Sequence, residues 1–387
     1  MLESDAIPQD YLLVGGGLQN GLIALLLLHR DPDARITLVE QAPTLGGNHT
    51  WSFHQSDVPA DCAEALAPAI QYTWDRYDVR FPSLDRTVAC GYVSILSEHL
   101  HAVLAARFAA APNAQLCLNT TVTDVGSDRV TLADGTVLHG RTVIDARGRG
   151  AGQAEAATGY QKFVGLELQL KQPGPWRHPV LMDARVQQRD GFRFFYVLPF
   201  APDRVLVEDT RFSDRPNLDV AELRHAVLRY AVEQGLAVRE ILRTEAGVLP
   251  MPWTASLACA TSPPLVAGYA GGFLHPATGY SFPVALRLAR YIADRSPETP
   301  FDAAWPEFLR CHQQQYRFAA FLNRLLFTAY APAKRFHIFQ RFYHLPEPVI
   351  ERFYRLEMTG RDKARIFLGR PPRGFSFRRL LEGAPKS

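Results

Sequence analysis

The chain has 387 residues, of which 47% are hydrophobic and 21% are charged. Such a composition can bury a large core and excludes a disordered chain, and the length indicates about two domains of roughly 150 residues each. The formal net charge of +3 gives no electrostatic argument for nucleic-acid binding.

The first residues and the cysteines bear on the compartment in which the protein works. Residues 1–10 are polar and acidic and lack the basic region of a signal peptide. The most apolar run, Leu22 to Leu28, is far shorter than the roughly 20 residues that cross a bilayer. The five cysteines are scattered without metal-ligand spacing, so we expect reduced thiols, no metal site and a cytoplasmic protein.

Residues 11–40 have the layout of a nucleotide-binding βαβ unit. A short apolar strand, Tyr11 to Val14, is followed at once by glycines, then by a buried helix from Gly21 to His29 and a second strand from Arg35 to Glu40. This order of strand, glycine turn, helix and strand predicts nucleotide binding. An ordinary glycine turn is the alternative.

Four residues of this unit are candidate nucleotide contacts. Gly15 permits the tight turn out of the strand, and Gly17 lets the backbone approach a pyrophosphate at the positive end of the helix. Asn20 stands where the usual pattern has a third glycine, so the helix packs slightly farther away or Asn20 caps it. Glu40, at the end of the second strand, is placed to bind the ribose hydroxyls of an adenosine.

Two later segments favour FAD over NAD. Gly46 and Gly47 give a second stretch of bare backbone near the pyrophosphate. A helix is then predicted over residues 98–110, with strands over residues 115–125 and 129–132. The next strand, residues 141–145, ends in Ala-Arg-Gly and resembles the segment that closes over FAD in large flavoproteins. Asp145 and Gly148 are therefore candidate FAD contacts, with a plain strand exit as the alternative.

The chain changes character after residue 160 and indicates an inserted antiparallel sheet. Strands are predicted over residues 165–170, 192–199 and 204–208, followed by a helix over residues 219–234. The third strand ends in Glu208 and Asp209, whose side chains point to opposite faces of a strand. One carboxyl can face a buried site as an acid or base while the other stays in water. An ordinary exit from a strand is the alternative.

A loop rich in glycine and proline follows a short buried strand at residues 264–268. We expect the backbone N–H groups of Gly279 and Tyr280 to face the carbonyls of a flavin. Further candidate flavin contacts in this loop are Gly271, Gly272 and Pro276. His275 is a candidate catalytic group, although a loop histidine beside a proline is more often structural. The Gly-Asp pair with which most flavoproteins begin this loop is missing.

From residue 284 onward the chain is expected to be mostly helical, with a basic end. Residues 331–387 hold 13 Lys and Arg against 5 Asp and Glu, and aromatic residues interleave with the basic ones. On a helix, Phe336, Phe339 and Tyr343 fall near one face, which we expect to rest on an anionic membrane surface. The alternatives are that these rings close the core, or that the charges form a solvated face.

Together these elements predict an α/β fold with a Rossmann-like FAD-binding domain, an inserted, mainly antiparallel substrate domain and a helical C-terminal region. The expected boundaries are residues 1–160 for the first part of the FAD-binding domain, 161–255 for the substrate-binding sheet, 256–300 for the return to the FAD-binding domain, and 301–387 for the helical region.

Several long strings closely resemble the bacterial lycopene β-cyclases, a family of FAD-dependent carotenoid cyclases. They are GGNHTWSF at residues 46–53, VEDT at 207–210 and FLHPATGYS at 273–281, and the likeness continues through residues 15–22, 321–327 and 341–343. The likeness spans most of the chain in order. Asn20 and the missing Gly-Asp pair are also features of this family.

The resemblance implies an enzyme that binds FAD, needs it reduced, commonly by NADPH, and leaves the oxidation state of its substrate unchanged. The acyclic ψ-end of lycopene is protonated on its terminal alkene, the tertiary cation closes a six-membered ring, and loss of a ring proton gives the β-ionone end. Lycopene thus passes through γ-carotene to β-carotene. The family assigns the acid/base carboxyl to Glu208, with Asp209 and His275 next in line. An enzyme with such a substrate is expected to be a peripheral membrane protein.

Aromatic residues of the strand at 192–199 are candidates for a wall that excludes water and faces the cation, or for plain core. They are Phe192, Phe194, Phe195 and Tyr196. Two rival functions share the nucleotide-binding layout: an FAD-dependent monooxygenase of the aromatic-hydroxylase type, and a nucleotide-binding protein without catalysis. The Glu208–Asp209 pair and the missing Gly-Asp count against the monooxygenase.

Overall fold

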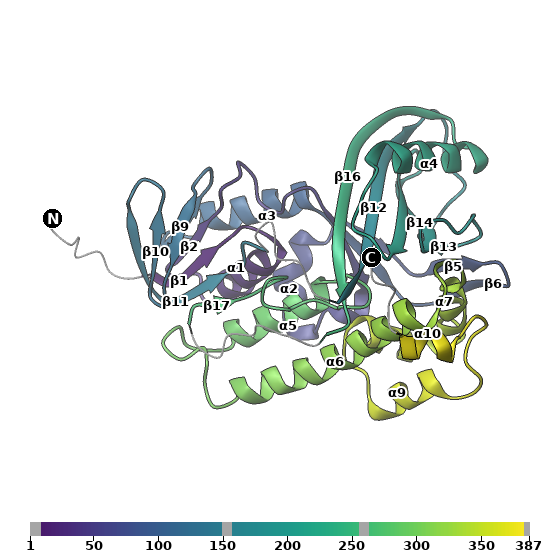
Figure 1. Ribbon diagram of the computed structural model, residues 1–387. Helices are drawn as coiled ribbons and strands as arrows, with labels where there is room; N and C mark the ends of the chain where they lie inside the picture. Colours follow the sequence, from purple (N-terminus) through teal and green to yellow (C-terminus); the bar gives the residue numbers. More distant parts are fainter. Residues whose placement is uncertain (1–8, 149–156, 255–262, 383–387) are drawn as a thin grey trace.

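The computed structural model describes residues 9–148, 157–254 and 263–382. Two large sheets lie beside each other, and the helices of the last third of the chain pack along one side of both (Figure 1). This arrangement is the mixed α/β architecture that the sequence predicts.

The first sheet carries the glycine turn. Its strand order is β8-β2-β1-β11-β10-β9, with β17 paired to β11, and the strands from β8 to β11 together with β17 are parallel. The bounds are β1 (Gln9–Val14), β2 (Ile36–Val39), β8 (Ala114–Cys117), β9 (Val122–Val125), β10 (Arg129–Leu132), β11 (Val137–Asp145) and β17 (Leu265–Val266).

Both faces of this sheet are covered, as is usual for parallel strands. Leu13 faces the side where helices α1 (Leu18–Arg30), α3 (Ser97–Ala110) and α5 (Phe282–Ala293) pack. Leu12 faces the other side and contacts the residues of β9 and β10. The apolar run at residues 22–28 is therefore a buried helix of this layer.

The sequence predicts one strand over residues 115–125, whereas the structure has β8 and β9. Asn119 lies between them with a φ of 52°, a left-handed conformation that interrupts a strand. Its N–H donates to the carbonyl of Ala42, and the N–H of Thr120 donates to the carbonyl of Glu40. The turn is thus tied to the end of β2.

The second sheet is the inserted one. Its strand order is β16-β12-β15-β14-β13-β5-β6, and its pairs are antiparallel except for β13 with β5. The bounds are β5 (Tyr77–Phe81), β6 (Leu84–Val88), β12 (Thr158–Leu170), β13 (Val180–Asp183), β14 (Phe192–Ala201), β15 (Arg204–Ser213) and β16 (Val238–Pro252). Helix α4 (Val220–Glu233) covers one face, where Val164 and Val207 cluster with Val227.

This sheet reaches beyond the expected segment of residues 161–255. Its strands β5 and β6 come from the part of the chain expected to belong to the first domain, as does a small sheet of β3 (Thr50–His54), β7 (Tyr92–Leu96) and β4 (Tyr72–Trp74). The 15-residue β16 also has no counterpart among the predicted strands, because its buried and exposed residues do not alternate regularly.

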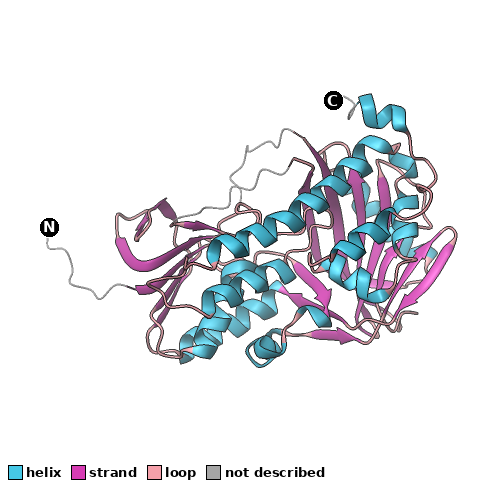
Figure 2. Ribbon diagram, turned by 90° about the horizontal axis from the view of Figure 1, so that it is seen from below, coloured by secondary structure: helices cyan, strands magenta, loops and turns pink. Residues whose placement is uncertain are grey.

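The C-terminal region is helical, as expected. Its helices are α6 (Trp305–Ala329), α7 (Phe336–Phe342), α8 (Glu347–Tyr354), α9 (Gly360–Phe367) and α10 (Phe377–Glu382). The long α6 runs past both sheets (Figure 2). Near its start Trp305 packs against Tyr291 of α5, and near its end the amide of Asn323 donates to the carbonyls of Pro252 and Pro276. Helix α6 therefore fastens the end of β16 to the loop after β17.

The aromatic face predicted for residues 336–343 packs in part against the core. Tyr343 is fully buried, and its hydroxyl is 2.7 Å from that of Tyr354. The ring of Phe339 stacks on Phe192 of the second sheet at 4.2 Å. These contacts favour the alternative that the rings close the core, although Phe336 and Phe339 are only partly buried, and membrane contact of this face stays a prediction. Within the described ranges, no helix is long and apolar enough to span a membrane.

Candidate functional site

A cavity of about 740 Å³ lies where the glycine turn of the first sheet meets the second sheet. Its volume is within the range of roughly 300–1,000 Å³ that is typical of small-molecule sites. The cavity is walled by the start of α1, the loop after β17 and the face of the second sheet that α4 leaves uncovered. The sequence-predicted residues that line it are Gly15, Gly17, Glu40, Gly46, Gly47, Gly148, Glu208, Gly279 and Tyr280.

The glycine turn at the end of β1 is shaped by two different requirements. Gly15 has a φ of +92°, and a Cβ there would lie 2.8 Å from the carbonyl oxygen of Ala146. A Cβ on Gly17 or Gly148 would meet no atom of the described chain within 4 Å, because both positions face the open cavity. Gly15 is thus needed for the fold of the turn, whereas Gly17 and Gly148 leave room for a ligand.

Asn20 braces this turn from beneath and does not line the cavity. Its side-chain amide donates to the carbonyls of Val14 and Gly15, at 3.0 and 2.9 Å. The residue is fully buried in the first turn of α1. Asn20 therefore replaces the usual third glycine by holding the turn with its side chain, and it is not the cap of the helix, a position that Gly17 occupies.

Glu40 is already engaged by backbone donors at the end of β2. Its carboxylate accepts from the N–H of Gly16 at 2.6 Å and from the N–H of Ala42 at 2.8 Å. The N–H of Gly46 donates to the carbonyl of Gly16, which joins the second glycine segment to the first. The carboxylate lines the cavity beside the glycine turn, where an adenosine ribose is expected.

The lining also offers polar groups without an internal partner. Among the described residues, the side-chain oxygens of Gln19 and Gln161 are buried and accept no hydrogen bond, and both residues line the cavity. The first backbone N–H groups of α1 have no side-chain cap. Open glycines, helix N–H donors and orphaned acceptors along one long cavity fit a dinucleotide such as FAD.

Several other candidate contacts lie behind the cavity wall. The carboxylate of Asp145 pairs with the guanidinium of Arg147, which itself lines the cavity. A Cβ on Gly271 would lie 2.0 Å from the carbonyl oxygen of Val266, so Gly271 serves the packing of the turn. Gly272 and Pro276 belong to the same turn and accept hydrogen bonds from α6 through their carbonyls.

His275 is fully buried and both of its ring nitrogens are used. Nε2 donates to the carbonyl of Phe353 at 2.9 Å, and Nδ1 accepts from the N–H of Ala277. Burial lowers the pKa of His275 to about 4. The side chain does not line the cavity, so its position is that of a structural residue.

Contrary to the prediction, the backbone N–H groups of Gly279 and Tyr280 do not face the cavity. The first donates to the carbonyl of His275 and the second to the hydroxyl of Thr278, because the loop folds into a tight turn. It is the side chain of Tyr280 that enters the wall, where its hydroxyl lies 2.6 Å from that of Tyr92.

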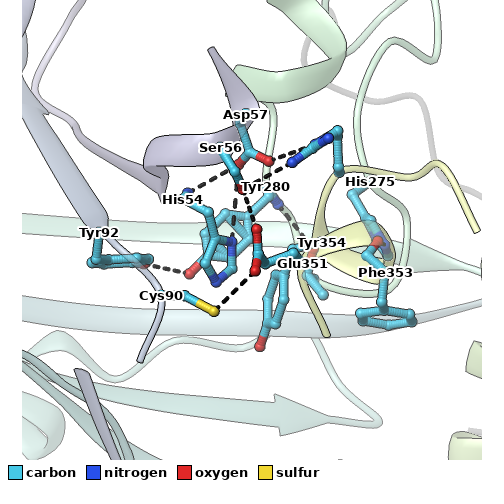
Figure 3. A network of polar contacts seen from close by, with 12 residues as sticks. His54, Ser56, Asp57, Cys90, Tyr92, His275, Tyr280, Glu351, Phe353 and Tyr354 are labelled. Atoms are coloured by element: carbon cyan, nitrogen blue, oxygen red, sulfur yellow. Dashed lines mark hydrogen bonds and ion pairs between the residues drawn. The ribbon is translucent and has the colours of Figure 1, made fainter. Parts of the chain in front are cut away.

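A buried polar network supports this tyrosine pair from behind (Figure 3). His54 lies 3.2 Å from the hydroxyl of Tyr77, and its ring packs against that of Tyr92. The N–H of His54 donates to Asp57, which also accepts from the guanidinium of Arg355 after α8. Burial lowers the pKa of His54 to about 4 and raises that of Asp57 to about 6. The network fixes β3 and the 3₁₀ helix η1 (Gln55–Asp57) against the C-terminal helices.

Glu208 lies on the cavity face of the second sheet in a row of directly paired residues. On one side it pairs with Tyr196 of β14, and on the other with Gly165 of β12. Gly165 in turn pairs with Glu245 of β16. Directly opposed residues of antiparallel strands share a face, so the two carboxyls flank a position without a side chain.

These two carboxyls form a coupled pair. Burial raises the pKa of Glu208 well above its usual value, and the charge of Glu245 and their hydrogen bond raise it further. Glu208 accepts from the hydroxyl of Thr210 at 2.5 Å. Glu245 accepts from the hydroxyl of Thr50 and the guanidinium of Arg243, both at 3.0 Å. Burial raises the pKa of Glu245 as well, but Arg243 and Thr50 act to lower it, so Glu208 is the member of the pair whose surroundings favour the protonated form more strongly.

Asp209 points to the opposite face, as the strand geometry predicts, but it is not in water. Its carboxylate is fully buried and accepts two hydrogen bonds from Arg193 and one from Arg211. Arg211 also binds Glu222 of α4. The expectation of a solvated second carboxyl is wrong, because α4 covers this face. Asp209 does not line the cavity and has the contacts of a structural ion pair.

Of the four aromatic residues proposed for a wall, Tyr196 lines the cavity. Phe195 faces α4 and stacks on Tyr230, and Phe192 and Phe194 stack on each other within the core. The wall is instead completed by residues from other segments. They are Trp51, Tyr92, Phe163, Phe273, Tyr280 and Phe282.

Comparison with known proteins agrees with this geometry. The model of the family "Lycopene cyclase protein" matches residues 10–380. A lycopene beta-cyclase of Pseudescherichia vulneris is 42% identical over 94% of each chain, and one of Pantoea ananas is 40% identical over 94% of this chain and 95% of its own. The chain belongs to the lycopene cyclase family. A lycopene beta-cyclase of Paracoccus is 38% identical over 95% of each chain.

Solved structures share the fold of this lycopene cyclase family member at low sequence identity. A geranylgeranyl bacteriochlorophyll reductase-like protein of Thermoplasma acidophilum aligns with a TM-score of 0.58 and 13% identity, over 96% of this chain and 94% of its own. A probable FAD-dependent monooxygenase of Pseudomonas aeruginosa aligns with a TM-score of 0.56 and 18% identity, over 93% and 100%. These neighbours show the fold alone.

The strings that mark the lycopene cyclase family meet at the cavity. In GGNHTWSF, Asn48 accepts from the guanidinium of Arg243 and donates to the carbonyl of Thr244, and Thr50 binds Arg243 and Glu245. This string therefore positions the Glu208 pair as well as the glycine backbone. Sequence reasoning missed Glu245, since an isolated glutamate in a strand without regular alternation carries no signal of its own.

Proposed function

We propose that this protein binds FAD in the cavity and converts the acyclic ψ-ends of lycopene to β-ionone rings, through γ-carotene to β-carotene. The observation that carries the proposal is the position of Glu208, a buried carboxyl without a cationic partner among the described residues, in the same cavity as the nucleotide turn. The 38–42% identity to named lycopene beta-cyclases favours this activity over that of an aromatic-hydroxylase-type monooxygenase.

FAD would be held at its pyrophosphate by the N–H groups at the start of α1 and by the open backbone of Gly17. Glu40 would hold its ribose, and Gln19 and Gln161 would accept its hydroxyl or N–H groups. In its reduced form, with NADPH as the reductant, bound FAD would supply negative charge that stabilises a nearby carbocation.

Glu208 is the group that starts the reaction in this proposal. An alkene is a poor base, so forming the cation is the main barrier, and only a carboxyl that burial keeps protonated at the working pH can deliver the proton. The side chains of Tyr92, Tyr196 and Tyr280 would face the cation and exclude the water that would turn it into an alcohol. When the ring carbon loses its proton, the substrate is uncharged again, and the reaction as a whole causes no net redox change.

The end of the basic, aromatic segment at residues 331–387 offers exposed apolar side chains for a membrane surface. Phe367, Leu368, Phe377 and Leu381 are 47%, 68%, 71% and 87% exposed, on or beside α9 and α10 (Figure 1). Exposed arginines lie between them in the chain at positions 370, 373 and 378, and another precedes them at position 365. Exposed apolar side chains among arginines suit an anionic bilayer, where lycopene dissolves.

The test is to express the chain in bacteria that accumulate lycopene and to analyse the pigments. Cyclic carotenes, with one or two β-ionone ends, are the expected products. Unchanged lycopene together with a folded protein would contradict the proposal. Oxygen-dependent hydroxylated products would instead favour the monooxygenase.

A further inference from the structure

We infer that Glu245 is the proton-sharing partner of Glu208, and that the two carboxyls act as one unit that both delivers and recovers the proton of ring closure. The inference rests on the proposed function, since it assigns a second residue to the same reaction. Glu245 lines the cavity, is 4% exposed and lies on a different strand from Glu208.

The spacing of the pair is created by Gly165. This glycine is paired with Glu208 on one side and Glu245 on the other, on the cavity face of β12. A Cβ at this position would lie 2.9 Å from Cγ and 3.1 Å from Oε1 of Glu245. Any larger residue would push the Glu245 carboxyl out of the row. The missing side chain therefore allows two carboxyls on non-adjacent strands to meet.

The surroundings of the two carboxyls are unequal, which places the proton. Glu245 accepts hydrogen bonds from the guanidinium of Arg243 and the hydroxyl of Thr50, so its anion is stabilised. Glu208 accepts from the hydroxyl of Thr210, and it pairs with no cation among the described residues. The guanidinium of Arg243 also donates a hydrogen bond to Glu167, so it binds more than one acidic side chain.

Other titratable groups near the pair lie on three sides. Tyr196 lies beside Glu208 on β14, Asp209 lies behind the sheet, and His49 lies in the loop before β3 near Arg243. Burial and the charge of Arg243 lower the pKa of His49, so it is neutral at physiological pH. Asp209 is compensated by Arg193 and Arg211. Glu245 is thus the neighbour whose charge acts most directly on Glu208.

The proton balance of a turnover follows from this arrangement. The O–H bond of Glu208 breaks as a C–H bond forms at the terminal alkene, which leaves two carboxylates facing each other. Two buried carboxylates in contact repel, so the pair is then a strong base. It takes the proton from the ring carbon, whose C–H electron pair becomes the ring double bond. If the accepting oxygen belongs to Glu245, the proton returns to Glu208 through their hydrogen bond.

The test compares Glu245→Gln and Glu245→Asp in the full-length, FAD-loaded protein, with Glu240→Gln as the matched control. Glu240 lies on the same strand but is exposed. Glu245→Gln is expected to lower kcat by roughly tenfold to a thousandfold. KM for lycopene and the FAD content should stay unchanged. Without the anion the pKa of Glu208 falls, so activity should be lost at a pH at least roughly one unit lower than in the wild type. Glu245→Asp should restore part of kcat and of the pH range.

An infrared titration reports the protonation of the two carboxyls and does not require turnover. The protonated-carboxyl band that disappears in Glu208→Gln should persist to higher pH in the wild type than in Glu245→Gln. A Glu245→Gln variant with unchanged kcat and pH limit would overturn the inference. So would one that loses FAD or thermal stability while its pH limit stays in place, because that is a structural role. If the wild type forms no rings, the proposed function fails, and the infrared titration still decides on the pair.

Discussion

At the scale of single residues, the cations beside them separate the two neighbouring acids of the VEDT string. Glu208 and Asp209 are both buried, but Asp209 is matched by two guanidinium groups and Glu208, among the described residues, by none. Burial without a cation favours the neutral form of a carboxyl. The same dipeptide thus supplies an acid on one face of the sheet and an ion pair on the other.

The substitution Glu208→Gln keeps the shape of this side chain and removes its acidic proton. We expect cyclisation to fall by roughly a hundredfold to ten-thousandfold, as is usual for the loss of a general acid, while FAD stays bound. The measurement is the rate of β-ring formation together with the flavin absorbance of the purified variant. A near-normal rate would move the acid role to another group. Asp209→Asn is the companion variant, and its main effect should be on thermal stability.

Gly17→Val tests the position of the cofactor. The added side chain meets no described protein atom within 4 Å, so the variant should fold and yet fill the space that a pyrophosphate needs. Purified protein is expected to be colourless. Gly360→Val is the control, since an added Cβ there also meets no described atom within 4 Å, far from the cavity. A Gly17→Val protein with full flavin content would show that the site is placed wrongly.

The residues of the site differ in how far the sequence alone could predict them. Gly15, Gly17 and Glu40 lie within one local βαβ pattern, so their places follow from a short stretch of chain. The opposite orientation of Glu208 and Asp209 follows from strand geometry, but the burial of Asp209 depends on α4, which follows later in the chain. Glu245 meets Glu208 through the register of β12, and no local pattern contains that register.

At the scale of elements, aromatic residues of the C-terminal region divide between core and surface in a way that composition does not reveal. The aromatic face of α7 packs against the second sheet, whereas apolar side chains of α9 and α10 are exposed to solvent. A helical pattern identifies which rings share a face, but which face is covered depends on the neighbouring elements. The helical character of this region is therefore confirmed, whereas which part of it meets a membrane stays a prediction.

The revised surface makes a prediction about vesicle binding. The double variant Phe377→Ser, Leu381→Ser removes the two most exposed apolar side chains of α10, so its sedimentation with anionic vesicles should weaken while FAD content is unchanged. Val232→Ser on α4, 72% exposed in the wild type, is the matched control and should bind as the wild type does. Raising the salt concentration should weaken binding further, since arginines contribute to it. Binding that ignores both the variant and salt would place the membrane contact elsewhere.

At the scale of the whole molecule, one fold serves both oxygen chemistry in its structural neighbours and a proposed ring closure without net redox change. The redox balance distinguishes the two. We expect ring formation to require reduced FAD, to proceed with dithionite in place of NADPH, and to consume no stoichiometric NADPH under anaerobic conditions. The measurement is NADPH oxidised per ring formed. One NADPH per ring together with an oxygen requirement would indicate a monooxygenase.

The path of the chain through its two sheets also bears on biosynthesis. Strand β11 has β17 as a neighbour, and α1 packs on α5 through a hydrogen bond from Gln19 to the carbonyl of Ala285. Each of these contacts joins residues more than a hundred positions apart, with strands β12 to β16 of the second sheet in between. While a ribosome is still translating the insert, the edge of β11 is open to pairing with other chains, a hazard for aggregation. A nascent chain stalled before residue 263 has the glycine turn but lacks the loop that closes the cavity. Retention of flavin is therefore expected to begin late in synthesis, which would make the cofactor a reporter of a completed chain.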